Sequence, residues 1–194
     1  IAGAVLPVIA VAVMLIFKGI QLEGFNKISH LYYWVPALIL NAVATELLLR
    51  GYLYQLYKRE YGVIASTVIT TLLYLSLEFE ILSQGKIYIA TMILFNILLC
   101  IIMEYSESML VTIIIRFVYT LFSTLFLGSL PLSGGYPVLL KTEIPGKALI
   151  TGGENGIEGS IIIISIIGIA AILIIWRVYN PIKLIKNLTK KRKA

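Results

Sequence analysis

Residues 44–51 read ATELLLRG and place Glu46 and Arg50 one helical turn apart inside a run of apolar residues. Side chains four positions apart lie on the same face of a helix, so this carboxylate and this guanidinium can meet. A charged side chain is costly inside a bilayer, and it therefore marks either a functional site or a fixed ion pair. Two later apolar segments also carry charge, Glu78 in one and Arg116 in the other, and we expect all four side chains to come together.

The composition indicates an integral membrane protein. Hydrophobic residues make up 59% of the 194 residues, charged residues make up only 13%, and the mean hydropathy is +0.95. A soluble globular domain has about 25% charged residues. A membrane-spanning helix needs about 20 mostly apolar residues. The hydropathy pattern predicts six such segments, at residues 2–17, 31–57, 62–82, 87–103, 109–127 and 161–176.

The fold class predicted from these segments is an all-α integral membrane protein, a six-helix transmembrane bundle that forms a single domain over residues 1–194. The sequence starts inside an apolar segment, without an initiating methionine or a charged leader. We therefore expect up to eight helices in the full chain, because one or two helices can precede the sequence given.

The basic residues predict how the bundle is oriented. Residues 177–194 contain seven lysines and arginines and no acidic residue. Short cytoplasmic segments are rich in Lys and Arg, so we expect a multi-pass protein of the cell membrane with this basic tail, the C-terminus, in the cytoplasm. Lys58 and Arg59 then fall on the same side. Most of the net charge of +6 lies in the tail. We interpret it as a topology determinant attracted to anionic lipid of the bilayer, and not as a site for nucleic acid.

Residues 128–160 form the longest stretch without a predicted helix, and this orientation places them on the outer side. Glycines and prolines punctuate the segment, but apolar residues such as Tyr136, Leu139 and Ile150 lie between them. These apolar residues are too many for a flexible linker. We expect an outward-facing loop that folds back over the bundle or contacts a partner, with a passive connector as the alternative.

The second and third segments form a helical hairpin that brings its charges to similar depths. Glu46 precedes Tyr61, near the expected turn, by 15 residues, and Glu78 follows it by 17 residues. At about 1.5 Å per residue the two carboxylates lie at a similar depth, which Arg116 shares. Arginine suits buried pairs because its planar guanidinium bonds a carboxylate through two N–H groups. The sequence therefore predicts a buried ion cluster of Glu46, Arg50, Glu78 and Arg116, with Glu78 and Arg116 as an ion pair.

The same region resembles the CPBP family of intramembrane proteases, which includes CAAX prenyl proteases and proteins of bacteriocin processing and immunity. Residues 45–51, TELLLRG, are similar to the family's motif Glu-Glu-x-x-x-Arg followed by Gly. Residues 74–78 fall on its Phe-x-x-x-His motif, and residues 116–120 fall on its His-x-x-x-Asn motif. Order and spacing agree from about residue 31 to residue 127, so the resemblance implies a CPBP-like bundle.

Most of the family's catalytic residue types are replaced in this chain. The resemblance implies a water-activating Glu where this sequence has Thr45, two histidines where it has Glu78 and Arg116, and an asparagine where it has Thr120. The second Glu of the first motif, Glu46, and its Arg50 are retained. An arginine is cationic and has no acceptor atom, so it cannot replace a metal ligand. We therefore predict no catalytic residues, no metal and no cofactor.

Other catalytic arrangements find little support in the sequence. The single histidine, His30, precedes Glu46 by 16 residues, which is about 24 Å along a continuous helix. The chain contains no Asp and one cysteine, Cys100, so an aspartyl dyad and a multi-cysteine metal site are excluded. Glu46 and Glu78 can share a proton in principle, but nearby arginines would hold both ionised.

The resemblance and these replacements together predict a CPBP-like pseudoprotease, a membrane scaffold or complex subunit that binds a peptide or a partner membrane protein, as bacteriocin-immunity members suggest. Two alternatives stay open. One is an active CPBP intramembrane peptidase of the CAAX type or for leader and bacteriocin processing. The other is a transport accessory subunit in which the charged cluster lines a pathway.

Overall fold

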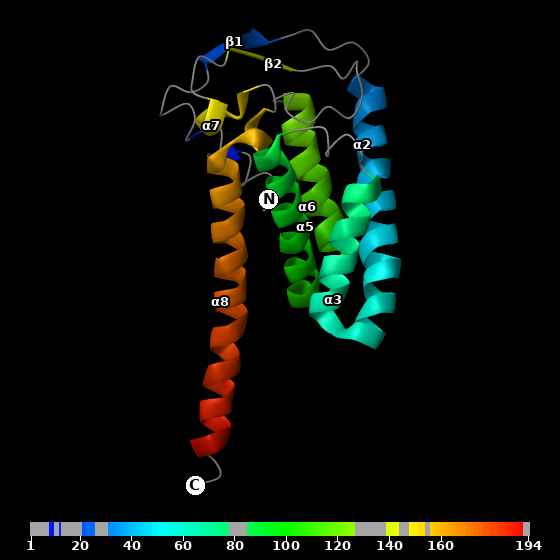
Figure 1. The fold of residues 1–194 in the computed structure, drawn as a ribbon, viewed down its shortest axis with the longest axis vertical. Helices are drawn as coiled ribbons and strands as arrows, with labels where there is room; N and C mark the ends of the chain where they lie inside the picture. The colour runs from blue at the N-terminus through cyan, green and yellow to red at the C-terminus, as the bar shows by residue number, and fades with distance from the viewer. Residues whose placement is uncertain are drawn as a thin grey trace.

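The computed structural model describes residues 8, 9, 12, 21–25, 31–77, 85–126, 139–143, 148–153 and 156–191. Helices packed side by side make up most of it, with a small sheet at one end (Figure 1). The elements, in chain order, are β1 (Gln21–Phe25), α2 (Leu31–Glu46), η1 (Leu47–Leu53), α3 (Tyr54–Leu77), α5 (Lys86–Ser106), α6 (Met109–Leu121), η2 (Phe122–Phe126), β2 (Leu140–Glu143), α7 (Ala148–Thr151), η4 (Ile157–Gly159) and α8 (Ile161–Lys191). The predicted fold class, an all-α membrane bundle, is confirmed.

The predicted hairpin of the second and third segments is present. α2, the π-helix η1 and the first turns of α3 follow one another as a continuous helical rod. The chain then reverses at Gly62, whose φ of 79° and ψ of 179° interrupt α3. Only glycine adopts such angles without strain, which explains why the turn lies directly after Tyr61. Figure 1 shows the rod and the returning part of α3 side by side.

Apolar segments of the sequence match the other helices. By length and composition, two helices of the described residues can cross a membrane, Tyr32–Leu77, which the reversal at Gly62 divides, and Lys86–Ser106. Two shorter apolar helices cover Met109–Thr124 and Ile161–Arg177. The first predicted segment, residues 2–17, lies almost wholly outside the described residues. The last helix, α8, continues through the basic tail to Lys191.

A hydrophobic core joins α5, α6 and α8. Phe95 and Leu99 of α5 pack with Ile163 and Ile167 of α8, and all four are almost completely buried. Tyr119 of α6 stacks on Phe95 with 4.1 Å between ring centroids. Because aromatic stacking and apolar burial act together here, this core holds α6 in a fixed position beside the charged hairpin.

The sequence analysis did not predict the sheet. β1 pairs with β2 in antiparallel fashion, from Gln21 opposite Glu143 to Phe25 opposite Leu140, with an irregularity between Leu22 and Gly24. It joins residues 21–25, which lie between two predicted helices, to the segment 128–160, which we expected to be a loop. β1 reads QLEGF, in which Gly24 interrupts the alternation of apolar and polar side chains, and β2 reads LKTE, which does not alternate.

The two ends of the bundle are formed by different elements. The sheet, α7 and the start of α8 lie at one end (Figure 1). The reversal at Gly62, the turn between α5 and α6 and the end of α8 lie toward the other end. Lys58 and the basic tail thus share one end, which is the arrangement that the predicted orientation requires.

Candidate functional site

The first part of the site is an ion pair within the hairpin. Glu46 is the last residue of α2, and Arg50 lies in the π-helix η1. Both side chains are buried, at 0% and 1% exposure. Arg50 Nη1 donates a hydrogen bond to Glu46 Oε1 at 2.5 Å. π-helical turns are rare, and those that occur are frequently found at functional sites. This one contains Arg50 and Gly51 of the motif discussed in the sequence analysis.

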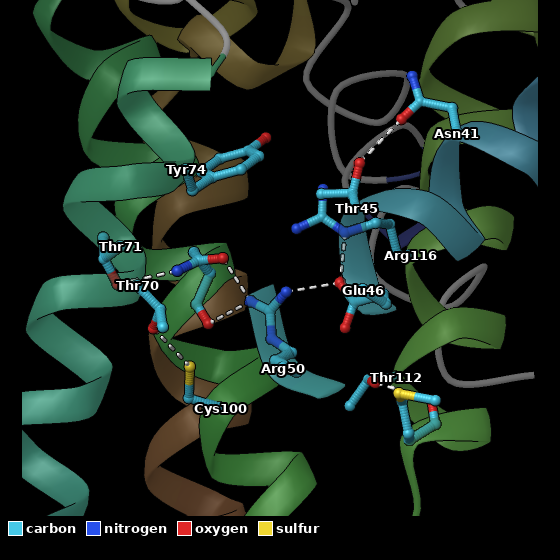
Figure 2. Close-up of polar contacts among 12 residues, drawn as sticks. Asn41, Thr45, Glu46, Arg50, Thr70, Thr71, Tyr74, Cys100, Thr112 and Arg116 are labelled. Atoms are coloured by element: carbon cyan, nitrogen blue, oxygen red, sulfur yellow. Dashed lines mark hydrogen bonds and ion pairs between the residues drawn. The ribbon is translucent and has the colours of Figure 1, made fainter. Parts of the chain in front are cut away.

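Arg116 of α6 binds the same carboxylate oxygen. Its Nε donates to Glu46 Oε1 at 2.5 Å, and its side chain is 6% exposed. The centre of its guanidinium also lies 4.9 Å from the centroid of the Tyr74 ring, a cation–π contact that helps to fix it. Figure 2 shows the side chains of Arg50 and Arg116 converging on Glu46. One carboxylate oxygen thus serves two arginines.

An amide on α5 completes the surroundings of Arg50. Arg50 Nη2 donates to Asn96 Oδ1 and, at 3.0 Å, to the Asn96 carbonyl oxygen. Asn96 Nδ2 donates to Thr71 Oγ1 at 2.8 Å, and Thr71 Oγ1 donates to the Thr67 carbonyl at 2.7 Å. This chain of bonds connects η1, α5 and α3 (Figure 2). The sequence analysis missed Asn96, although a single amide in the apolar segment 87–103 is a signal of a buried polar contact.

The η1 helix approaches α6 closely at Gly51. A Cβ atom at this position would lie 2.9 Å from Met109 Sδ, closer than Cβ atoms normally pack. The absence of a side chain at Gly51 therefore leaves room for the Met109 side chain directly after Arg50. Arg116 lies two turns further along α6 than Met109.

The remaining residues predicted for the site are placed as follows. Thr45, at the position of the family's first Glu, donates from Oγ1 to Asn41 Oδ1 at 3.1 Å on α2 and is not bonded to the ion cluster. Thr120 is half-buried on α6. Glu78 and His30 lie outside the described residues. The Glu78–Arg116 pair therefore stays a prediction, and in the described part the acidic partner of Arg116 is Glu46.

Charges in the described part of the cluster do not balance. Two guanidinium groups face a single carboxylate, and Glu46 Oε2 and Arg50 Nε have no hydrogen-bond partner among the described residues. Buried charges are normally compensated by opposite charge. Glu78, one residue beyond the end of α3, is the predicted source of the second negative charge.

A comparison with known protein families found a match in the region that contains the ion cluster. A family model described as "Type II CAAX prenyl endopeptidase Rce1-like" matches residues 27–122. Residues 27–122 are thus similar to the Rce1-like family, part of the CPBP family. No curated protein and no solved structure matches the chain. The matched range contains both Glu46 and Arg116, so the resemblance read from the motifs is confirmed at the level of the family.

The residues of this Rce1-like site do not fit a metal. No three His, Cys, Asp or Glu side chains gather within the described ranges. At the position where the resemblance implies the second histidine, the cationic Arg116 bonds directly to the only described carboxylate of the cluster. A guanidinium offers no lone pair and repels a cation. We therefore derive no metal-dependent step from this site.

A second buried carboxylate belongs to η4, directly before α8. Glu158 of η4 is fully buried, and Tyr119 OH donates to its Oε1 at 3.3 Å. The chain reaches this position through a tight crossing at Gly152, where φ is 87° and a Cβ would lie 1.5 Å from the Gly156 carbonyl oxygen. Only glycine fits there. No motif and no hydrophobic periodicity around Glu158 indicates a buried acid at this position.

Proposed function

We propose that this Rce1-like protein is a pseudoprotease, a membrane scaffold or complex subunit that binds a peptide or a partner membrane protein. One observation carries the proposal: Arg116 donates to Glu46 at the position where the family resemblance implies a histidine ligand. The retained acid is thereby held in an ion pair with two arginines. A carboxylate held in this way is a poor general base, because a base must be free to take a proton from water.

The surroundings of the cluster support a structural role. Glu46, Arg50 and Asn96 are buried and tie four helical elements together. The bonds from Arg50 and Arg116 to one carboxylate, and from Arg50 to Asn96, fix the positions of these elements relative to one another. A scaffold needs a fixed bundle on which a partner can dock, and the network supplies it without any chemical step.

The family also contains enzymes, and an assay separates the two possibilities. We expect purified protein in detergent or nanodiscs to release no product from prenylated CAAX peptides or leader-bearing peptides, and to hold no stoichiometric zinc. A catalytically competent member of the family, treated identically, is the positive control. Peptide cleavage that is lost in Glu46→Gln, or zinc that is lost in Glu78→Ala, would establish a peptidase and overturn the proposal.

We further propose that the protein crosses the cell membrane several times, with residues 177–194 in the cytoplasm and residues 128–160 outside. Two features support this. Lys58 precedes the reversal at Gly62 by four residues, and this reversal lies toward the same end of the bundle as the end of α8 (Figure 1). Cytoplasmic segments are enriched in Lys and Arg. The net charge of +6 then faces anionic lipid headgroups, so the proposal includes no nucleic-acid partner.

The outer segment is the part of the chain that we propose as the docking surface. Within it, Leu149 and Ile150 of α7 are exposed at 64% and 38%. α7 contacts the buried η4, which packs against α5 and α8 and so anchors the segment to the bundle. Deleting residues 138–155 is expected to abolish co-purification of a partner while the helices still insert. Protease resistance of the helical core serves as the control for folding. A partner that still co-purifies with the deletion variant would place the docking surface elsewhere.

A further inference from the structure

One face of α2 carries two small residues and one amide where a lipid-facing helix is normally apolar throughout. The exposed residues of this face recur at spacings of four, three and four positions: Ala37, Asn41, Ala44 and Leu48. This spacing is the seam of two helices that pack with a left-handed crossing. α2 lies at the edge of the bundle (Figure 1), and its opposite face, with Leu38, Ala42 and Glu46, is buried.

Asn41 sits at a depth where an amide is costly. It lies ten residues after Leu31, the first residue of α2, or about 15 Å along the helix axis. The hydrocarbon layer is about 30 Å thick. With the start of α2 taken as one boundary of this layer, Asn41 falls near its middle. Its Oδ1 accepts a hydrogen bond from Thr45 Oγ1 at 3.1 Å, as Figure 2 shows. No described residue accepts a hydrogen bond from its amide nitrogen, and lipid tails offer no acceptor.

We propose that this face is a homodimer interface, in which α2 of one copy packs against α2 of a second copy and the two Asn41 amides bond to each other. A carboxamide is both donor and acceptor, so it complements its own copy across a twofold axis. Ala37 and Ala44 flank Asn41 and allow the backbones to approach closely. The face carries no charged residue that would repel its own copy.

A second copy of the protein is the partner that fits this face of α2 most directly. All copies insert with the same orientation, so residue 41 of one copy lies at the depth of residue 41 of the next without any further adjustment. A helix of another protein would need its own polar residue at that depth. The proposal is independent of the loss of catalysis: an active peptidase could form the same dimer, and a monomeric protein could still be a pseudoprotease.

Cysteine cross-linking tests this interface directly. The background is Cys100→Ala, because Cys100 is the single, buried native thiol. Ala37→Cys and Ala44→Cys are expected to give a disulfide-linked dimer on mild oxidation in liposomes at a high lipid-to-protein ratio. Leu72→Cys is the matched control, because Leu72 is 60% exposed on the other arm of the hairpin. It is expected to give only the background of random collisions.

Substitution of Asn41 shows whether cross-linking reports a specific interface or only the proximity of two copies. Asn41→Leu is expected to lower the cross-linked fraction of Ala44→Cys several-fold, and Asn41→Gln, which keeps the amide, is expected to retain most of it. The unchanged melting temperature of Asn41→Leu would show that the fold is intact. Cross-linking at Ala44 no stronger than at Leu72, insensitivity to Asn41→Leu, or a one-to-one complex with a different membrane protein on this face would each overturn the homodimer.

Discussion

Glu46→Leu is expected to destabilise the protein more than any other single substitution in the hairpin. Glu46 Oε1 is the acceptor for both Arg50 and Arg116, at 2.5 Å in each case. Its loss leaves two guanidinium groups buried without their shared carboxylate. Breaking one buried ion pair costs about 3 to 5 kcal/mol because an uncompensated charge stays in a medium of low dielectric. The loss here is expected to reach or exceed the upper end of that range.

Thermal or denaturant unfolding in detergent, together with the yield of folded protein, measures this loss. The matched control is Glu104→Leu. Glu104 also accepts from one cation, Lys58, at 2.7 and 2.9 Å, but the two side chains are 29% and 37% exposed. Exposed ion pairs contribute about 0 to 1 kcal/mol. Equal effects of Glu46→Leu and Glu104→Leu would mean that burial does not set the strength of the Glu46 cluster.

The helical fold could be predicted because long apolar runs are the most regular feature of the sequence. Long apolar runs identify the helices, and the reversal at Gly62 follows from a glycine beside the charged end of the hairpin. Both signals are local, so they need no knowledge of packing. Glu46 and Arg50 were predicted to meet for the same reason, because four residues separate them on one helix.

The residues that the sequence analysis missed depend on contacts between distant parts of the chain. Asn96 lies 46 positions from Arg50, and nothing local indicates that they meet. Glu158 is buried because a glycine-rich crossing happens to direct η4 inward. In the described part, the acid that pairs with Arg116 is Glu46, 70 positions away, and no local pattern in the sequence indicates this pair.

Arg116→Met tests whether Glu78 belongs to the cluster, and the sign of its effect follows from the charges. Glu46, Arg50 and Arg116 together carry one excess positive charge. If no further acid were present, removing Arg116 would leave the neutral pair of Glu46 and Arg50, and the variant would be close to wild type. If Glu78 neutralises the cluster, removing Arg116 leaves one excess negative charge instead.

We predict the second result, with a loss of about 3 to 5 kcal/mol for Arg116→Met and a similar loss for Glu78→Leu. The double variant replaces both charges by apolar side chains of similar volume and is expected to recover most of the stability, so the two losses are strongly non-additive. Unfolding in detergent of the four proteins in this cycle measures the coupling. Additive losses, or a neutral Arg116→Met, would remove Glu78 from the cluster. A water-filled path beside Arg50 and Arg116 would then be the better account of the unbalanced charge, because water, like a carboxylate, solvates a guanidinium.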